Sequence, residues 1–225
     1  MSQYRRVHLL LEGQTEERVV VGLFQPFLES LGWSVTQSTL ITSRPRLGSA
    51  YRGGVSTWAK LRKELNALLR DRSINVLTTI IDYYRFPRDA PGMADRPDGP
   101  AQARVQHVES AMVRAIGDDR FVPHLSLHES EAWVYAAAVP LGELLGAPGL
   151  AKTLQREAQS AGGPELINDG PDTAPSKRLC AHWPTYSKVL HGPPALAELG
   201  VARLREQCPH LDQWLVRLEG LTPAG

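Results

Sequence analysis

The sequence predicts an α/β fold in which a mostly parallel sheet is flanked by helices and followed by a helical extension. Short apolar runs without turn residues alternate with longer segments whose apolar residues recur at helical spacing. This alternation requires crossover connections, which are typical of parallel sheets. After residue 139 the strand signals stop. We therefore expect an α/β core over residues 1–139 and a helical extension over residues 140–225 that packs on it.

Four segments are expected to be strands of the sheet. Residues 75–81 have the clearest pattern, because Val76 to Ile81 are all apolar or β-branched. Residues 7–11 form an apolar run that ends at Glu12-Gly13, which is typical of a strand buried on both faces. The other two expected strands cover residues 35–42 and 121–127.

Helices are expected in the connections between these strands. Apolar residues recur at helical spacing up to the stop signal at Gly32, and Pro26 predicts a kink or a restart in this first helix. Two further amphipathic helices are expected over residues 56–70 and 105–116. Residues 86–100 contain four prolines and two glycines, so we expect a solvated loop that is long enough to act as a mobile flap.

The composition is that of a globular protein. The chain has 225 residues, 42% of them hydrophobic, and a formal net charge of +1, so bulk charge does not point to nucleic acid or membrane and such partners must be read from local patches. The apolar run at residues 7–11 is too short for a signal peptide or a membrane span. With only two cysteines, the chain is expected to be cytoplasmic, in a reduced compartment and without a membrane partner.

Acidic side chains follow three of the four expected strands. They are Glu12, Asp82, and Glu129 with Glu131. Ligands of open parallel sheets bind at the carboxyl ends of the strands, and gathered carboxylates resist ionisation unless a cation neutralises them. Oxygen-rich sites of this kind suit Mg²⁺ or Mn²⁺ as a cofactor, and these ions can activate water and stabilise a phosphoryl displacement. The sequence therefore predicts a metal site built from these four acids.

Each acid alone has a simpler interpretation. Acids after strands are often helix N-caps or first-turn charges that the helix dipole stabilises. This interpretation suits Glu16 and Glu17 in particular, which fall in a first helical turn. Acids after three strands of one sheet favour the metal site.

Four ordered motifs resemble an uncharacterised bacterial family. That family is a domain of unknown function with a Toprim-like fold, often encoded beside an ABC-type ATPase related to overcoming-lysogenisation-defect nucleases. The resemblance covers nearly the whole chain and rests on Glu12-Gly13-Gln14-Thr15-Glu16, Asp82-Tyr83-Tyr84-Arg85-Phe86-Pro87, His128-Glu129-Ser130-Glu131-Ala132-Trp133 and Thr173-Ala174-Pro175-Ser176-Lys177-Arg178.

The resemblance implies roles for the strand-end acids. In Toprim proteins the first strand ends in a glutamate that acts in acid/base chemistry or binds metal, and a later strand ends in an Asp-x-Asp metal motif. Glu12 matches the glutamate and Asp82 matches the first aspartate, but Tyr84 stands where the second aspartate would be. Glu129 or Glu131 could supply the missing carboxylate, the site could hold one metal instead of two, or the fold could be non-catalytic.

The residues next to these acids allow more than one interpretation. His128 could orient a phosphate or bind metal as an accessory to the site, as Glu16 could, but a structural hydrogen-bonding role is an equal alternative for the histidine. The aromatic residues Tyr83, Tyr84 and Phe86 could stack a base of a single strand. The sequence favours the alternative in which they pack the loop onto the core.

A nucleic-acid contact is expected from basic residues. Residues 44–72 contain eight Lys or Arg against two acids. Arg44, Arg46 and Arg52 could form a rim that tracks phosphates around the acidic centre, although a solvated helix face is the default for such a run. The resemblance suggests that Lys177 and Arg178 also hold a phosphate, while surface exposure explains them equally well.

A zinc site is a weaker hypothesis. The pairs Cys180-x-His182 and Cys208-x-His210 could supply four ligands, but their spacing is tighter than that of zinc knuckles. Buried structural cysteines are favoured.

Two main functions compete. The first is a metal-dependent nuclease that cuts DNA or RNA together with an ATPase partner, in defence against phage or mobile elements. The second is a non-catalytic Toprim-fold subunit that binds or regulates such an ATPase, which the missing aspartate at Tyr84 favours. A phosphohydrolase acting on small molecules is a third possibility on the same chemistry.

Overall fold

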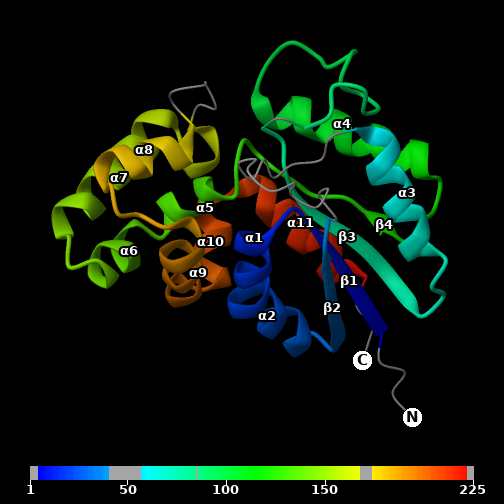
Figure 1. Cartoon of the computed structure of the whole chain (residues 1–225), viewed down its shortest axis with the longest axis horizontal. Helices are drawn as coiled ribbons and strands as arrows, with labels where there is room; N and C mark the ends of the chain where they lie inside the picture. The colour runs from blue at the N-terminus through cyan, green and yellow to red at the C-terminus, as the bar shows by residue number, and fades with distance from the viewer. Residues whose placement is uncertain (1–4, 41–56, 85, 168–173, 222–225) are drawn as a thin grey trace, which may run out of the picture.

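A parallel sheet with helices packed on both faces forms the centre of the protein (Figure 1). The computed structural model describes residues 5–40, 57–84, 86–167 and 174–221. The expected α/β fold with a helical C-terminal region is confirmed. None of the described helices has the length and apolar character needed to cross a membrane.

The strands follow the order β2-β1-β3-β4, and β5 pairs with β3 beyond the end of β4. Each of these pairings is parallel. All four expected strand segments are confirmed, but the fourth is divided into two short strands. Pro123 lies at the division, and its missing N–H cannot contribute to the ladder. The strands are β1 (Arg5–Leu11), β2 (Trp33–Thr39), β3 (Ile74–Asp82), β4 (Phe121–Val122) and β5 (Leu125–Ser126).

The helical segment after β1 changes its winding before Pro26. It consists of α1 (Gln14–Val19), the π-helical turn η1 (Val20–Phe24) and α2 (Gln25–Ser30). In a regular α-helix the ring of Pro26 would clash with the carbonyl four residues earlier. The wider π turn relieves this clash, so the interruption expected at Pro26 is confirmed.

The opposite face of the sheet is covered by α3 (Trp58–Leu69), α4 (Ala101–Ile116) and the loop of residues 86–100. The expectation that this loop is a solvated flap is wrong for its first half. Phe86, Ala90 and Met93 are buried in the same hydrophobic cluster as α3 and α4. Proline and glycine specify turns here, whereas the apolar residues between them decide what the turns cover.

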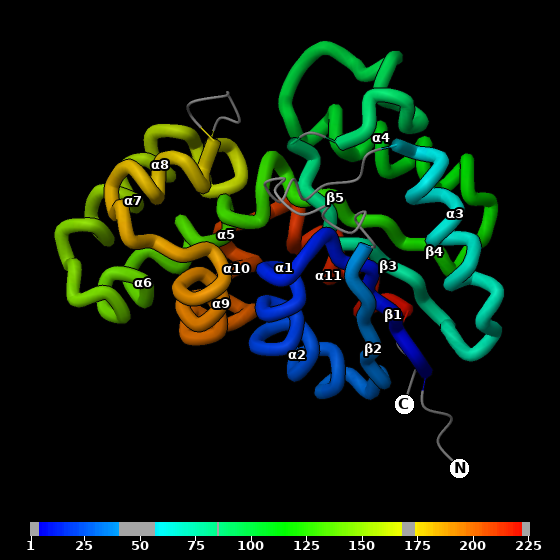
Figure 2. The backbone as a smooth tube through the Cα atoms, in the orientation of Figure 1, coloured from blue at the N-terminus to red at the C-terminus, as the bar shows by residue number. Residues whose placement is uncertain are grey.

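The C-terminal helices complete the first face of the sheet. Leu9 of β1, Phe24 of η1 and Trp214 belong to one hydrophobic cluster, and the ring of Phe24 packs edge-on against Trp133 and Trp214. The remaining elements are α5 (Glu131–Ala136), α6 (Ala138–Leu144), α7 (Pro148–Ala161), the 3-10 turn η2 (Pro164–Leu166), α8 (Pro175–His182), α9 (Lys188–Leu199), α10 (Val201–Gln207) and α11 (Pro209–Gly220). In Figure 2, α6 to α8 extend away from the sheet, and α11 lies behind its strands.

Candidate active site

Acidic side chains from three strand ends lie close together at the carboxyl edge of the sheet. Glu12 follows β1, Asp82 is the last residue of β3, and Glu129 and Glu131 follow β5. The backbone N–H of Asp82 donates to Glu12 Oε2 over 2.8 Å. The ladder between β1 and β3 continues past β1, because the N–H of Glu12 donates to the carbonyl of Ile80. Parallel pairing thus places Glu12 beside Asp82.

Ser130 connects the third strand end to the other two. Its backbone N–H donates to Asp82 Oδ1 over 2.8 Å, and its hydroxyl donates to Glu16 Oε1 over 2.6 Å. Glu16 is therefore part of the cluster and is buried. Glu16 lies in the first turn of α1, as expected, and the fold also turns its side chain toward the β5 end.

Glu129 and Glu131 each have a defined partner. Glu129 Oε2 accepts the backbone N–H of Ser176, at the N-terminus of α8, over 3.1 Å. Lys188 Nζ, at the start of α9, lies 2.9 Å from Glu131 Oε1. Both acids are buried. The helical C-terminal region therefore contributes one helix end and one cation to a site whose acids come from the sheet.

Burial and mutual repulsion make three of these acids hard to ionise. Burial raises the pKa of Glu12 to about 7, and the charges of Glu16 and Glu131 add to this rise. Burial, and then the charge of Glu12, raises the pKa of Asp82 well above its usual range. Burial also raises the pKa of Glu131 to about 7, against the opposing effect of Lys188. Although burial acts against it, the charges of Glu131 and Glu129 raise the pKa of Lys188.

A cation would relieve this repulsion. Carboxylate oxygens are the ligands that Mg²⁺ and Mn²⁺ prefer. Within the described ranges, no three carboxylates of the cluster present oxygens that all lie within 4.8 Å of one another. A Mg²⁺ ion here would bind one or two carboxylates directly and keep several waters, which is its usual manner of binding in phosphoryl-transfer sites.

His128 shapes the backbone of the site. It is the one described non-glycine residue with a left-handed backbone, at φ 67°, and its carbonyl accepts the N–H of Tyr84 over 2.8 Å. Its ring is buried. A left-handed backbone costs a non-glycine residue free energy and occurs often at functional sites. The turn at His128 directs the chain so that Ser130 faces Asp82.

The aromatic residues after β3 pack in the interior. Tyr83 and Phe86 are buried in the cluster with α3 and α4, and the hydroxyl of Tyr83 accepts a hydrogen bond from Arg96 over 2.7 Å. The packing role favoured from the sequence is confirmed for these two residues.

Of the basic residues expected to bind nucleic acid, the structure describes Lys177 and Arg178. Arg178 Nη1 lies 3.9 Å from Glu157 Oε1 on α7, and Lys177 is exposed on α8. Arg44, Arg46 and Arg52 lie outside the described residues. Their contact with nucleic acid stays a prediction.

Three contributors to the site were missed from the sequence. Ser130 and Ser176 lie within the motifs that carry the family resemblance, so the motifs themselves were a usable signal. Lys188 has no such signal. It is a single lysine at a helix start, and only the fold brings it to Glu131.

The chain matches one known family. A family model described as "Domain of unknown function (DUF4276)" matches residues 11–219. No curated protein and no solved structure matches the chain.

Proposed function

The chain belongs to the DUF4276 family, and we propose that it is a metal-dependent nuclease of Toprim-like type. The observation that carries the proposal is the meeting of Glu12, Asp82 and the acids after β5 at one edge of a parallel sheet. In such a site Mg²⁺ or Mn²⁺ would activate water and stabilise the charge of an in-line phosphodiester displacement.

The acids have different suggested roles. Asp82 is the principal metal ligand, because it matches the first aspartate of the Toprim motif and its N–H and carboxylate connect the other two strand ends. Glu12, with a pKa near 7, suits a metal ligand or a proton acceptor at neutral pH. Glu129 or Glu131 supplies the carboxylate of the second motif aspartate, whose position Tyr84 occupies.

Lys188 supports chemistry on a phosphate. An ammonium group beside a metal site can stabilise the negative charge that develops in phosphoryl transfer. Its nitrogen now lies 2.9 Å from Glu131. A metal that draws Glu131 toward itself would release Lys188 to contact the substrate.

Partner and substrate follow from the resemblance and the charge pattern. The family resemblance suggests an ABC-type ATPase partner and a role in defence against phage or mobile elements. The basic run at residues 44–72 favours a nucleic acid over a small phosphorylated metabolite. Co-expression with the neighbouring ATPase is expected to yield a complex that co-purifies, and a chain with full activity that binds no neighbour contradicts this part of the proposal.

A cleavage assay tests the catalytic proposal. The assay uses single- and double-stranded DNA and RNA, with Mg²⁺ or Mn²⁺, with and without the ATPase and nucleotide. We expect Asp82→Asn to reduce cleavage by at least about 100-fold, since it keeps the shape but removes a ligand charge. Asp98→Asn, an exposed carboxylate outside the cluster, is the matched control and should leave cleavage unchanged.

The alternative function is a non-catalytic regulatory subunit of the ATPase complex. The tyrosine at position 84 favours it, because the Asp-x-Asp motif is incomplete. If the wild-type protein cuts nothing under any combination, or Asp82→Asn cuts as well as the wild type, the nuclease proposal fails and the regulatory function replaces it.

A further inference from the structure

A second group of possible metal ligands lies at the edge of the sheet, away from the acidic cluster. It consists of Glu109 on α4, His124 between β4 and β5, and His210 in the first turn of α11. The exposed fractions of these residues are 4%, 1% and 3%. The three side chains come from three different elements, which meet where the two helical layers approach each other around the edge strands.

The ligand atoms have the spacing of a metal site. Glu109 Oε1 lies 3.1 Å from His210 Nε2 and 3.9 Å from His124 Nδ1, and the three ligand atoms all lie within 4.8 Å of one another. Zn²⁺ binds nitrogen and carboxylate oxygen at about 2.1 Å in tetrahedral geometry, so neighbouring ligand atoms are about 3.4 Å apart. The distances from Glu109 to the two histidines lie on either side of that value.

Hydrogen bonding within the protein accounts for only part of this cluster. Glu109 Oε1 accepts the backbone N–H of Leu125 over 2.8 Å. The bond between His210 and Glu109 explains one ring nitrogen. Within the part of the chain that the structure describes, both ring nitrogens of His124 and Nδ1 of His210 have no hydrogen-bond partner. Buried polar atoms are rarely left in this state. His124 is almost completely buried and its Nδ1 faces Glu109. The unpartnered ring nitrogens therefore indicate a bound metal ion.

The surrounding contacts hold the ligands in place. The hydroxyl of Thr79 donates to the carbonyl of His124 and accepts its N–H, and Glu165 accepts the N–H of His210. The ring of His124 stacks against Trp214 and Trp133, with ring centroids 4.8 Å and 6.0 Å away. These contacts hold the backbones of His124 and His210 and the ring of His124 in position.

We propose that Glu109, His124 and His210 bind a divalent transition metal ion, with Zn²⁺ the best fit to two imidazoles and one carboxylate. The ion joins α4 on one face of the sheet to α11 on the other through the edge strands. We assign it a structural role because all three ligands are buried; three protein ligands leave a fourth position for water. It also fixes β5, whose end carries Glu129 and Glu131 of the acidic cluster.

This arrangement replaces the zinc site considered from the sequence. Cys180 is exposed and Cys208 is buried, and the metal-ligand group that contains His210 includes neither cysteine. The preference for two buried cysteines is therefore wrong for Cys180. Of the four proposed ligands only His210 is retained, because the fold pairs it with residues far away in the chain.

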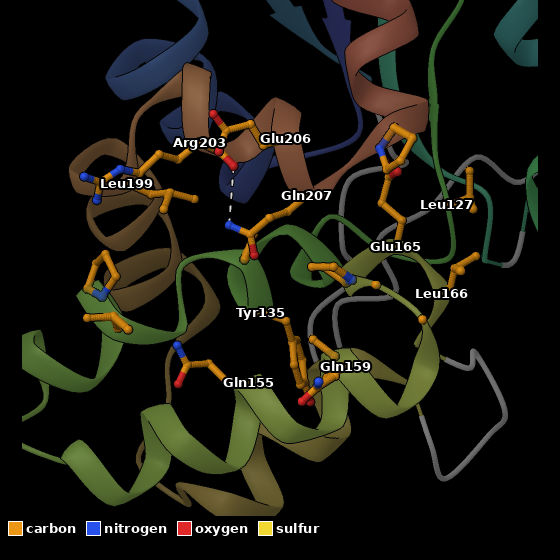
Figure 3. A pocket seen from close by; sticks show the side chains of 18 of the residues that line it. Leu127, Tyr135, Gln155, Gln159, Glu165, Leu166, Leu199, Arg203, Glu206 and Gln207 are labelled. Carbon is orange, nitrogen blue, oxygen red and sulfur yellow. Dashed lines mark hydrogen bonds between the residues drawn. The ribbon is translucent and has the colours of Figure 1, made fainter.

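A cavity lies beside the start of α11. A cavity of about 900 Å³ between α5, α7 and α10 is lined by Leu127, Glu165 and Pro209, among others. Figure 3 shows Glu165 and Leu127 on one side of it, and Tyr135 with Gln159 on another. Glu165 accepts the backbone N–H of His210, and Pro209 precedes it, so the cavity adjoins the backbone of one proposed ligand.

Metal analysis of the full-length protein without an affinity tag tests the proposal. After dialysis against EDTA we expect about one equivalent of transition metal per chain, measured by inductively coupled plasma mass spectrometry. Metal-free protein, prepared with a stronger chelator, should take up one equivalent of Co²⁺ and show the visible absorption bands of a tetrahedral site. A wild-type protein that retains no metal and binds neither Co²⁺ nor Zn²⁺ overturns the proposal.

Variants locate the site and separate it from the acidic cluster. His210→Gln and His124→Phe should each lower bound metal at least tenfold, and circular dichroism checks that they fold. His182→Gln removes an exposed histidine that also contacts a carboxylate, Glu157, over 2.8 Å, and should keep the full equivalent. Asp82→Asn should also keep it, whatever its effect on cleavage. Equal metal content in folded His210→Gln and wild type would contradict the assignment.

Discussion

At the scale of single residues, Glu12 and Glu131 have a higher pKa than ordinary surface carboxylates. The fold raises the pKa of each from 4.5 to about 7, mainly through burial. Between pH 4.5 and pH 7, therefore, these two acids keep protons in the folded protein that they have lost in the unfolded chain. By linkage, the stability that these protons confer is complete below the unfolded pKa and is lost as the pH rises through about 7.

This linkage predicts how the metal-free protein responds to pH. Between pH 6 and pH 8 each of the two acids should lower the free energy of unfolding by on the order of 1 kcal/mol. That corresponds to a fall in Tm of about 2–4 °C for each kcal/mol. Millimolar Mg²⁺ should raise Tm more at pH 8 than at pH 6, because it competes with protons for the same carboxylates. Thermal denaturation at both pH values, with and without Mg²⁺, measures this effect.

The control for this prediction is Glu12→Gln. The glutamine keeps an oxygen that can accept the N–H of Asp82 but does not titrate, so the fall in Tm between pH 6 and pH 8 should be smaller in this variant. A wild-type Tm that rises over this range, or that does not change with Mg²⁺ at pH 8, would show that these acids do not interact with one another as the structure indicates.

At the scale of elements, the loop of residues 86–100 is held on α4 by close packing at Gly92. Gly92 has φ +79°, and a Cβ at this position would lie 2.9 Å from Ala111 Cβ and 3.1 Å from Val108 Cα. Both the backbone conformation and the contact distance therefore require glycine. The first half of the loop is therefore part of the layer that covers the second face of the sheet.

Gly92→Ala is expected to destabilise the protein by roughly 2–4 kcal/mol, the sum of a left-handed backbone and an overpacked contact. Gly117→Ala is the matched control, because Gly117 at the end of α4 also has a positive φ, 67°, but has nothing within 4 Å of an added Cβ. It should cost only about 1–2 kcal/mol. Urea denaturation measures both changes. Equal decreases in the free energy of unfolding of the two variants would mean that the loop moves to accommodate the added methyl group and is not packed against α4 as described.

At the scale of the whole molecule, the sheet and the C-terminal helices share one core. The indole of Trp214 on α11 donates to Thr78 Oγ1 on β3 over 2.8 Å, and Phe24 packs against both Trp133 and Trp214. The start and end of the described chain are also close, because Arg5 Nη1 donates to the carbonyl of Leu221. The strands could not bury their first face without the residues after 139.

A fragment of residues 1–139 is therefore expected not to fold cooperatively. It would expose the apolar side chains of β1 and β3 that now share a hydrophobic cluster with the C-terminal helices, at a cost of about 25 cal/mol per Å² of apolar surface. Circular dichroism melting and the dispersion of amide NMR signals test this. Adding a separate fragment of residues 140–225 should restore a cooperative transition. A fragment 1–139 that melts cooperatively near the Tm of the full chain would show an independent core.

The sequence by itself determined the features that depend on neighbours along the chain. Apolar runs specified the strands, Pro26 specified the interruption in the first helix, and acids placed after strands specified where carboxylates gather. These features were predictable because parallel pairing brings the carboxyl ends of strands to one edge. Only the tertiary structure decided which distant side chains complete the sites. Lys188 meets Glu131, and Glu109 and His124 meet His210, because packing of helices on a sheet joins residues whose separation in sequence carries no local pattern.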